Sequence, residues 1–425
     1  MRLLILGINY APEIISTAVY TTGLAEDMAR RGDEVAVVTA VPYYPAWKVA
    51  SGWRQRWRRE RREGVTVTHC PLYVPARPTG ARRILHHASF ALTALPVMLW
   101  SALRRRPDLV LVIAPSLVAA PVGWLAARLT GARAWLHIQD FEVEAAFATG
   151  LLAESSRVGR AAVAFERWLL RRFDRISTIS GPMLKKLCQK QVPEARVFEL
   201  RNWANLAAVR PLDGPSPLRK ALGIDRRHVV LYSGNLANKQ GLEIIPEVAR
   251  RLAHRDDLAI AVCGDGPMCE RLLRSARGLP ALRCFPLQPP EKLSDLLGMA
   301  DIHLLPQIGG AADLVLPSKL TNMLASGRPV IATARPDTAL GREVEGCGCL
   351  TPPGDAGALA AAIEALLDDP AERARLGAAA RARAIERWNG EVILDRLHRE
   401  FLRMLAVPDP SGLPHAVELA EEEHR

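Results

Sequence analysis

The stretch VVLYSGNLANKQG, residues 229–241, begins with a short, mostly apolar run and continues into a glycine-containing loop with a lysine. Such runs, rich in β-branched residues and bounded by turn residues, are typical of buried strands in parallel sheets. In these sheets ligands bind to the loops that follow the strands, at their carboxyl ends. The stretch therefore predicts a strand of an α/β domain followed by a loop that suits an anionic ligand.

The same alternation of short apolar runs and longer helical patterns extends in both directions from this stretch. A chain of 425 residues is longer than one hydrophobic core usually supports. We therefore predict two Rossmann-like, doubly wound α/β domains that face a cleft. The expected strands lie at residues 3–6, 35–39, 65–69, 109–113, 134–138, 175–179 and 197–200, and then at 229–233, 259–263, 282–285, 302–305, 330–333 and 349–351.

The domain boundary is expected in residues 202–217, where Pro and Gly are frequent. We predict an N-terminal domain over residues 1–204 and a C-terminal domain over 205–385. A helix over 386–407 should pack back on the fold, and the acidic tail 408–425 should be disordered. The apolar stretch after Met1 is too short for a signal peptide and is followed by Tyr10 and Pro12 without a cleavage site, so we interpret it as a buried strand.

The net charge of +11 is concentrated in the first half of the chain. Residues 1–204 carry 29 Lys and Arg against 16 Asp and Glu, a net charge of +13, whereas the remaining residues have a net charge of −2. This asymmetry predicts an anionic partner for the first half, such as membrane lipid or a phosphorylated substrate. Nucleic acid is disfavoured, because the basic residues are not interleaved with a recognisable nucleic-acid-binding module.

Two segments of the first half favour a membrane surface as the anionic partner. Six arginines lie between Arg54 and Arg62, and the segment from Ala88 to Leu103 has sixteen residues without a charge between two arginine clusters. Sixteen residues are fewer than the roughly 20 that span a bilayer. We predict a helix lying in the interface of an anionic membrane, and a buried core helix is the alternative. The side chains expected to face lipid are Phe90, Leu92 and Trp100.

Cysteine usage indicates reduced thiols and no metal centre. The chain has seven cysteines, and its only close pairs, Cys263 with Cys269 and Cys347 with Cys349, lack the spacing and the histidine neighbours of a zinc site. An odd number of scattered cysteines is typical of a protein kept in a reducing compartment. We expect no cofactor.

Polar residues follow several predicted strands at the edge where ligands should bind. His137, Gln139 and Asp140 end one strand, with Glu142 just beyond, and several polar residues together favour a functional site over one structural histidine. The loop over residues 7–13, after the first strand, can offer backbone N–H groups to phosphate. An ordinary strand-to-helix turn is the alternative there.

Three loops of the second half suit a bound nucleotide. One contains Gly234 and Lys239, one contains Asp265 and Gly266, and the third leads through Ser318 into a predicted helix whose free N–H groups would favour phosphate. Because the three loops follow strands of one parallel sheet, we expect them at one edge, where they would form a nucleotide site.

Several longer motifs occur in a characteristic order: GINYAPE (7–13), PYYP (42–45), CPLYVP (70–75), LHIQD (136–140), YSGN (232–235) with KQG (239–241), and AD (312–313) followed by LPSKLTN (316–322). Through these motifs the chain, up to about residue 405, resembles the family-4 retaining glycosyltransferases, in particular their colanic-acid-biosynthesis (WcaI-type) branch. The resemblance implies a GT-B fold, with the donor nucleotide on the second domain and the acceptor on the first.

The resemblance also implies which reaction the enzyme catalyses and where in the cell it acts. We expect retaining transfer of a sugar from a GDP- or UDP-linked donor to a polyprenyl-diphosphate-linked glycan, in exopolysaccharide biosynthesis of the colanic-acid type. The enzyme should be cytoplasmic and peripherally associated with the inner face of the cell membrane. No two aspartates are separated by a single residue, so the Asp-x-Asp metal clamp of the other glycosyltransferase class is absent and transfer should be metal-independent.

The chain departs from the family pattern at several site positions. Asn235 stands at the position of a family arginine, while Lys239 keeps the family lysine. The two family glutamates correspond to Leu314 and Asn322, and Ser16 takes the place of a first-loop glycine. The family histidine aligns nearer Gln139 than His137.

With the resemblance added, the candidate residues fall into three groups. The catalytic candidates are Lys239, His137, Gln139 and Asp140. The donor-binding candidates are Gly234, Asn235, Gln240, Asp265, Gly266, Phe285, Leu287, Asp313, Pro317, Ser318, Lys319 and Asn322. The acceptor-side candidates are Asn9, Tyr10, Glu13, Ser16 and Glu142.

Two rival functions remain open from the sequence. One is a nucleotide-sugar epimerase of the same architecture, which would need neither an acceptor nor a membrane helix. The other is a non-catalytic membrane subunit that senses nucleotide sugar, which the missing glutamates keep open.

Overall fold

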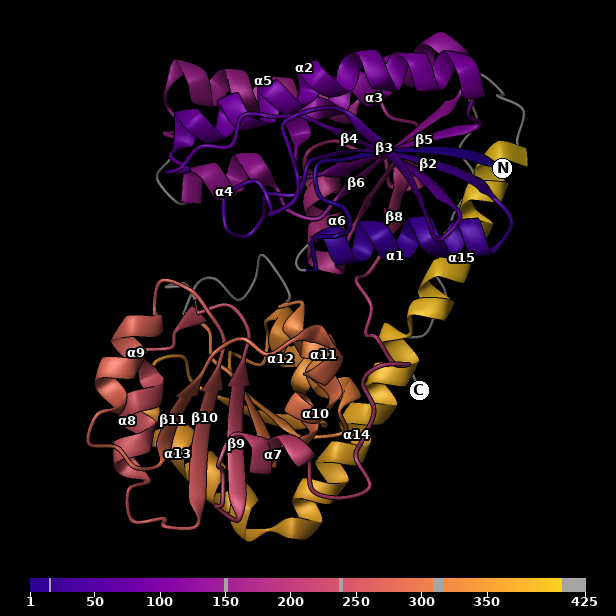
Figure 1. Ribbon diagram of the computed structural model, residues 1–425. Coiled ribbons are helices and arrows are strands. Elements are labelled where there is room, and N and C mark those ends of the chain that lie inside the picture. The colour runs from indigo at the N-terminus through magenta and orange to yellow at the C-terminus, as the bar shows by residue number, and fades with distance from the viewer. Residues whose placement is uncertain (15–16, 149–151, 237–239, 309–316, 407–425) are drawn as a thin grey trace. The chain divides into compact units, whose positions relative to one another are not determined.

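The computed structural model describes residues 1–14, 17–148, 152–236, 240–308 and 317–406 (Figure 1). The chain divides into two compact units. The first contains Met1–Arg201 and the chain from Val392 onward, and the second contains Asn202–Glu391. Each unit is a largely parallel sheet covered by helices, so the predicted pair of Rossmann-like α/β domains is confirmed.

The sheet of the first unit has the strand order β3-β4-β2-β1-β5-β6-β7-β8. All neighbouring strands are parallel except β3, which is antiparallel to β4. The direction of the crossovers reverses at β1, so a topological switch point lies between the carboxyl ends of β1 and β5. The strands are β1 (Arg2–Gly7), β2 (Glu34–Ala40), β3 (Arg58–Arg62), β4 (Val65–Cys70), β5 (Leu109–Ala114), β6 (Arg133–Ile138), β7 (Arg175–Thr178) and β8 (Val197–Glu199).

Helices cover both faces of this sheet (Figure 1). Leu4 and Leu6 of β1 share a core cluster with Phe90 and Met98 of α2, because alternate residues of a strand point to the same face. On the opposite face Phe401 of α15 contacts Trp135 of β6. The helices of this unit are α1 (Thr17–Arg30), α2 (Gly80–Arg105), η1 (Leu117–Ala119), α3 (Ala120–Thr130), α4 (Glu142–Ala148), α5 (Arg157–Leu170), α6 (Gly181–Gln189), η2 (Glu194–Arg196) and α15 (Gly390–Ala406).

Helix α15 attaches to the first unit through contacts between aromatic rings and through polar contacts, which include the ion pair of Asp395 with Arg31 (3.0 Å). The Phe401 and Trp135 rings meet edge to face with centroids 4.9 Å apart, and His398 lies 3.0 Å from Asp33. The expected boundaries after residues 204 and 385 fall instead after 201 and 391. The reason is local: the Ala204 N–H donates to the Trp388 carbonyl (2.8 Å), which joins the start of the linker to the end of α14.

The sheet of the second unit is entirely parallel, with the order β11-β10-β9-β12-β13-β14. Its strands are β9 (His228–Ser233), β10 (Leu258–Cys263), β11 (Leu282–Phe285), β12 (Ile302–Leu305), β13 (Val330–Thr333) and β14 (Gly348–Thr351). The crossover direction reverses at β9, so the switch point lies between β9 and β12. The helices are α7 (Pro217–Ala221), α8 (Ile244–Arg251), α9 (Cys269–Ala276), η4 (Pro290–Lys292), α10 (Leu293–Gly298), α11 (Lys319–Ala325), α12 (Ala339–Val344), α13 (Ala356–Asp368) and α14 (Pro370–Trp388).

The arginine-rich stretch contains a strand that the sequence did not predict. Arg58–Arg62 forms β3 at the edge of the first sheet, with four arginines and one glutamate and no apolar residue. Charged residues on an edge strand protect it from pairing with another chain. Trp57, just before β3, donates its indole N–H to the Thr93 carbonyl of α2 (3.1 Å), so this basic edge lies beside α2.

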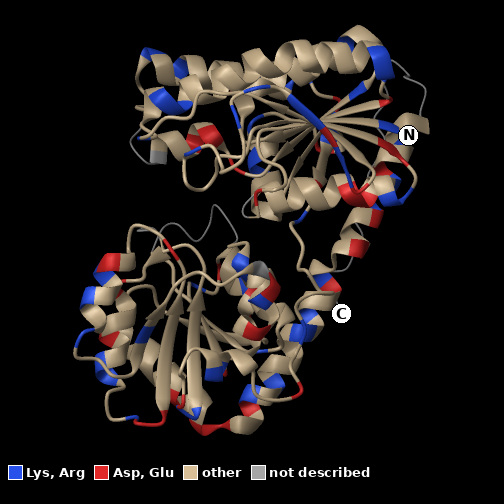
Figure 2. Ribbon diagram, viewed as in Figure 1, with Lys and Arg blue, Asp and Glu red and all other residues tan. Residues whose placement is uncertain are grey.

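Helix α2 is longer than expected, with 26 residues starting at Gly80. Within the described part of the chain it is the one helix that meets a length-and-hydropathy test for crossing a membrane. Phe90, however, is 0% exposed and lies in the core, so the expectation that it faces lipid is wrong. Figure 2 shows no charged residue along the middle of α2.

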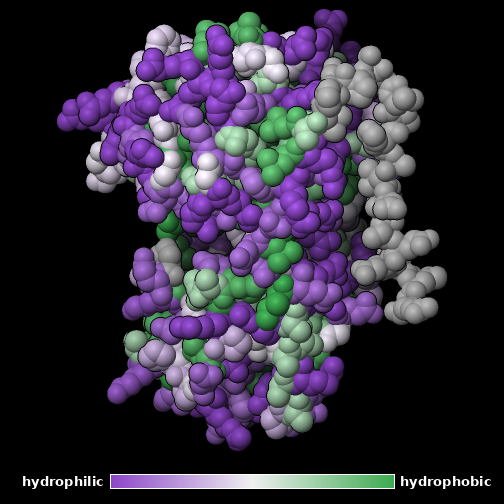
Figure 3. All heavy atoms as spheres, turned by 90° about the vertical axis from the view of Figure 1, so that its right-hand side faces the viewer, coloured by the Kyte–Doolittle hydropathy of each residue, from purple (hydrophilic) through white to green (hydrophobic). Residues whose placement is uncertain are grey.

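Exposed apolar residues elsewhere are more scattered. On the side of the molecule seen in Figure 3, hydrophobic residues occur in small groups among hydrophilic ones. Along α2, in contrast, Leu92, Trp100 and Leu103 are 71%, 66% and 59% exposed on a single helix. Isolated exposed apolar residues are normal, whereas these three lie on one helix.

Candidate active site

The loops after β9 and β10 pack backbone against backbone. Gly234 has φ +128°, a conformation that residues with a side chain rarely adopt. A Cβ added to Gly264 would lie 1.9 Å from the Gly234 carbonyl oxygen, and one added to Gly266 would lie 2.9 Å from Asn235 Oδ1. Glycine is therefore needed at these positions, and the tight packing leaves backbone groups at the carboxyl edge of the sheet.

Lys319, the first residue of α11, reaches across the switch point to β9. Its ammonium donates to the Tyr232 hydroxyl (2.7 Å) and to Gln240 Oε1 (3.2 Å). A Cβ on Gly234 would lie 3.3 Å from Lys319 Nζ, so the ammonium lies directly beside this loop. The candidate donor residues Gly234, Gln240 and Lys319 are thus brought together.

Burial lowers the pKa of Lys319 to about 7, because a charged ammonium is disfavoured away from water. Its two hydrogen-bond acceptors, the Tyr232 hydroxyl and the Gln240 amide, are neutral. Burial also raises the pKa of Tyr232, whose hydroxyl donates to the Asn235 carbonyl (2.8 Å). Among the described residues Lys319 forms no ion pair with a carboxylate, so it is available to neutralise a bound phosphate.

Tyr232 was not among the predicted site residues. Its position one residue before the end of β9 was a usable signal, because strand ends point at the ligand edge. Its contact with Lys319 joins positions 87 residues apart, which no local pattern reveals.

The other donor-side candidates have different positions. Asp265 Oδ1 accepts a hydrogen bond from the N–H of Gly266 (2.8 Å), which stabilises the loop after β10. Phe285 ends β11 and Leu287 is 54% exposed just beyond it, so both offer apolar surface near the same edge. Pro317 and the exposed Ser318 directly precede α11.

Asn322, at the position of a family glutamate, has a structural contact. Its Oδ1 accepts a hydrogen bond from the backbone N–H of Asn205 (3.1 Å), which ties the linker to α11. Lys239, Asp313 and Ser16 lie outside the described residues, so their roles stay predictions.

In the first unit, Glu13 connects the loops after β1 and β2. Asn9 Nδ2 donates to one carboxylate oxygen (2.8 Å), and the backbone N–H groups of Tyr43 and Tyr44 donate to the other (2.8 Å each). Burial raises the pKa of Glu13, while these three hydrogen bonds stabilise its carboxylate. Tyr10 is buried beside this network and is 2% exposed.

His137 is part of a buried chain of polar contacts. Its Nδ1 lies 2.9 Å from Ser177 Oγ, which also accepts a hydrogen bond from the Trp135 indole N–H (2.8 Å). Its Nε2 lies 3.1 Å from Gln139 Nε2. Burial lowers the pKa of His137 to about 3, so the ring is neutral. Both ring nitrogens of His137 contact other side chains, and 2% of the residue is exposed. The buried imidazole therefore helps to fix the position of the Gln139 side chain amide.

Asp140 and Glu142 follow β6 at the same edge. Glu142 accepts a hydrogen bond from the N–H of Leu117 (2.7 Å), which begins the segment after β5. Burial raises the pKa of Glu142 to about 7, and the negative charge of Asp140 adds to this increase. The catalytic candidates Gln139 and Asp140 and the acceptor-side candidate Glu142 therefore lie together beside the switch point of the first sheet.

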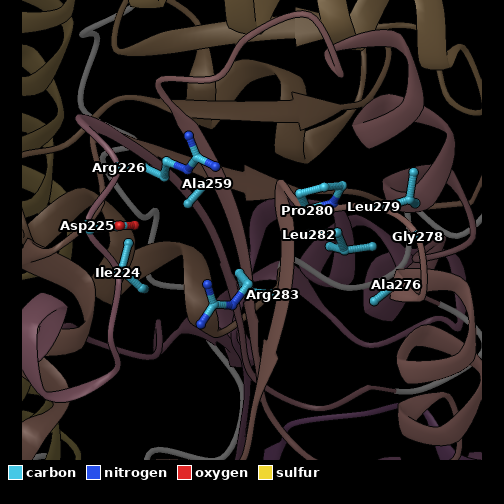
Figure 4. A pocket seen from close by; sticks show the side chains of 10 residues that line it. All are labelled: Ile224, Asp225, Arg226, Ala259, Ala276, Gly278, Leu279, Pro280, Leu282 and Arg283. Atoms are coloured by element: carbon cyan, nitrogen blue, oxygen red, sulfur yellow. The ribbon is translucent and has the colours of Figure 1, made fainter.

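The second unit also contains a cavity of about 510 Å³ at the opposite edge of its sheet (Figure 4). It is lined by Asp225 and Arg226, which precede β9, and by Ala259, Leu282 and Arg283 near the starts of β10 and β11. Since parallel sheets bind ligands at their carboxyl edge, this cavity is separate from the candidate nucleotide site.

The described residues contain no group of three or more His, Cys, Asp or Glu side chains that could hold a metal ion. All seven cysteines are free thiols. Among the residues that the structure describes, the Lys319 ammonium supplies positive charge beside the loop after β9.

Comparisons with known proteins agree with this division. The family model "Glycosyl transferase 4-like domain" matches residues 17–203, and the model "Glycosyl transferases group 1" matches residues 216–383. The chain is 43% identical to an Escherichia coli K12 protein assigned to colanic acid biosynthesis as glycosyl transferase WcaI, over 81% of this chain and 86% of that protein. This chain is a family-4 glycosyltransferase of the WcaI-type branch.

Solved structures confirm the GT-B fold of this glycosyltransferase. Sucrose-phosphate synthase from Thermosynechococcus elongatus matches with a TM-score of 0.74 at 18% identity, over 95% of this chain and 99% of that one. HepE of Anabaena, in complex with UDP-glucose, matches with a TM-score of 0.67 at 16% identity, over 95% and 100% of the two chains.

Proposed function

We propose that this glycosyltransferase moves a sugar, with retention of anomeric configuration, from a GDP- or UDP-linked donor to a polyprenyl-diphosphate-linked glycan. The product would be an intermediate of an exopolysaccharide of the colanic-acid type, as the name of the E. coli relative suggests. The observation that carries the proposal is the Lys319 ammonium, held without a described anionic partner at the switch point of the second sheet.

The donor's diphosphate would lie against the loop after β9. Gly234 allows close approach of a ligand to the backbone, and Lys319 supplies positive charge beside it. The sequence adds Lys239 on the same loop. The leaving diphosphate gains negative charge as the sugar–phosphate bond breaks, so preorganised cations lower the barrier.

The acceptor would lie against the first unit, near Gln139, Asp140 and Glu142. Its hydroxyl attacks the anomeric carbon from the side on which the diphosphate departs, and the departing phosphate takes up the hydroxyl proton. The main contribution of the protein is then to position two substrates and to exclude competing water. Lys319 and Lys239 would perform the charge neutralisation that a metal performs in other transferases, so transfer would not need a metal or another cofactor.

We further propose that the first unit lies on the inner face of an anionic membrane through α2. One side of α2 buries Phe90, Ala94 and Met98 in the core, while Leu92 and Trp100 on the other side are exposed. A helix already packed along a sheet suits the plane of the interface better than a bilayer span. Anionic lipid would complement the basic residues near its ends and at its side, namely Arg82, Arg83, Arg104, Arg106, Arg59 and Arg61.

The experiment that tests the proposal follows the anomeric configuration of the product. Purified enzyme is incubated with candidate GDP- and UDP-sugars and a lipid-diphosphate-linked glycan, and the new linkage is assigned by NMR. An α-linked donor should give an α-linked product. An inverted product would overturn the retaining mechanism while leaving the transferase assignment in place.

A further inference from the structure

The loop after β2, which contains the PYYP motif, gathers aromatic rings at the carboxyl edge of the first sheet. The Trp47 ring lies 5.6 Å from that of Tyr43 and 5.2 Å from the imidazole of His86 in α2. Trp47 has φ +50°, a left-handed conformation that is uncommon for a bulky residue and costs about 1 kcal/mol or more. Surrounding contacts therefore hold Trp47 in this position, and the Tyr44 ring lies next to that of Tyr43, 6.4 Å away.

Arg83 of α2 places its guanidinium over this cluster. Its Cζ lies 5.9 Å from the centre of the Trp47 ring, within the range of a cation–π contact. Among the described residues Arg83 has no ion pair with a carboxylate, and it is exposed. The positive charge of Arg83 nevertheless affects Tyr44 and Glu142 at the carboxyl edge of the sheet. Burial raises the pKa of both groups, and the charge of Arg83 counteracts part of each increase.

The N-terminal half of α2 is fixed to the loop after β4. His86 Nδ1 donates to the Tyr73 carbonyl (2.6 Å), the Tyr73 N–H donates to Ser89 Oγ (2.8 Å), and Thr93 Oγ1 donates to the Pro71 carbonyl (2.6 Å). The helix therefore starts at the carboxyl edge of the sheet and continues into the exposed apolar row that includes Leu92.

We propose that Arg83, placed over Trp47 beside Tyr44, binds the phosphate that joins the acceptor's lipid to its glycan. The ligand chemistry is a phosphate or diphosphate ester of a long apolar alcohol. A planar guanidinium can form two hydrogen bonds with phosphate oxygens, and the neighbouring rings offer apolar surface to the first isoprene unit or sugar. This inference rests on the proposed function and adds the residue that holds the acceptor at its lipid–glycan junction.

The test compares Arg83→Gln with Arg82→Gln, which removes the same charge from the neighbouring exposed position of the same helix. The probe is citronellyl diphosphate, a short isoprenoid diphosphate, titrated by calorimetry with the donor site saturated by nucleoside diphosphate. Loss of charge-assisted hydrogen bonds should weaken binding about 10- to 100-fold in Arg83→Gln and less than about 3-fold in Arg82→Gln. Arg83→Lys should recover part of the affinity, because the charge remains but the bidentate geometry is lost.

Two further ligands separate the possible sources of the phosphate. Inorganic diphosphate should bind more weakly than the isoprenoid ester, and binding to phosphatidylglycerol vesicles should fall equally in the two Gln variants. Equal weakening of citronellyl diphosphate binding by both variants would overturn the proposal, because it would indicate a general surface potential. A vesicle defect confined to Arg83→Gln, with normal isoprenoid binding, would overturn it in favour of a lipid headgroup.

The outcome is independent of turnover, because no donor sugar is present. If the enzyme transfers no sugar but shows the Arg83-specific loss, the proposed reaction fails and the phosphate site stands. If transfer occurs and Arg83→Gln binds the isoprenoid diphosphate normally, the proposed reaction stands and the phosphate site fails. Matching thermal melting curves of the variants exclude unfolding as the cause.

Discussion

Lys319 Nζ lies 2.7 Å from the hydroxyl oxygen of Tyr232, and this contact joins α11, which follows β12, to β9 across the switch point of the second sheet. The ammonium also lies 4.2 Å from the centre of the Tyr232 ring. Tyr232 thus acts as a support that holds the cation beside Gly234. The amine nitrogen is therefore positioned beside Gly234 in the free enzyme, and its protonation supplies the charge that electrostatic catalysis needs.

The lowered pKa of Lys319 predicts proton uptake when a nucleoside diphosphate binds. In the free enzyme the pKa is about 7, so at pH 8 only about a tenth of the molecules carry the proton. A bound diphosphate favours the charged form and raises this pKa, so affinity should fall as the pH rises above 7. Calorimetry at pH 8 in buffers of different ionisation enthalpy should give an uptake close to one proton.

The control for this measurement is a second lysine of the same unit. Lys319→Gln should lose the proton uptake and bind the nucleotide about 10-fold or more weakly, whereas Lys220→Gln, on the exposed surface of α7, should retain both. Unchanged uptake in Lys319→Gln would mean that another group takes up the proton.

Lys239 is predicted to stabilise the departing diphosphate. Lys239→Ala should lower kcat by about 10²–10³ and weaken donor binding less, because charge on the leaving group grows in the transition state. Lys239→Arg should recover only part of the activity, because a planar guanidinium does not reproduce a compact ammonium. Steady-state kinetics, with Lys220→Ala as the reference, measure this effect. Near-normal turnover by a folded Lys239→Ala enzyme would remove Lys239 from the catalytic site.

The outer side of α2 is predicted to bind the membrane. Leu92→Glu and Trp100→Glu should release the enzyme from anionic vesicles in a sedimentation assay without lowering Tm, and binding by the wild type should weaken with salt. Leu273→Glu, at a residue of the second unit that is 48% exposed, should leave vesicle binding unchanged. Phe90→Ala should instead destabilise the fold by about 3–5 kcal/mol, because it creates a cavity. Unfolding of Leu92→Glu would show that this side of α2 is ordinary core.

Transfer is predicted to proceed without a metal ion. The rate in excess EDTA should match the rate in Mg²⁺ or Mn²⁺, because lysines take the place of a metal beside the leaving group. Activity that is lost in EDTA and restored only by a divalent metal would contradict this prediction, because it would show that the lysines do not replace a metal.

Much of the fold was predictable because the buried strands are continuous apolar runs. β5 reads LVLVIA and β9 reads HVVLYS, and both are fully buried in parallel sheets. β3 was missed because RRERR has no apolar alternation, and only its pairing with β4 makes it a strand. The start of α2 was placed too late because polar residues interrupt its pattern. One of them, His86, is buried and paired with the Tyr73 carbonyl.

The candidate site was predictable in outline from strand ends but not in its contacts. Lys319 was predicted from its position at the start of a helix at the ligand edge, whereas its contact with Tyr232 depends on the tertiary fold. His137 is a second example: its strand-end position predicted a catalytic role, which stays a prediction. Its burial against Ser177, 40 residues away, left no signal in the local sequence.

The most direct test of the account is whether loss of donor sugar is coupled to glycosylation of an acceptor. The enzyme is incubated with labelled nucleotide sugar, with and without a polyprenyl-diphosphate-linked glycan, and the nucleotide products and the glycan are quantified together. The account predicts one nucleoside diphosphate released for each sugar added, and negligible change of the nucleotide sugar when the acceptor is absent. Interconversion of nucleotide sugars without acceptor would identify an epimerase, and binding without turnover on any lipid-linked acceptor would identify a sensor; either result would contradict the account.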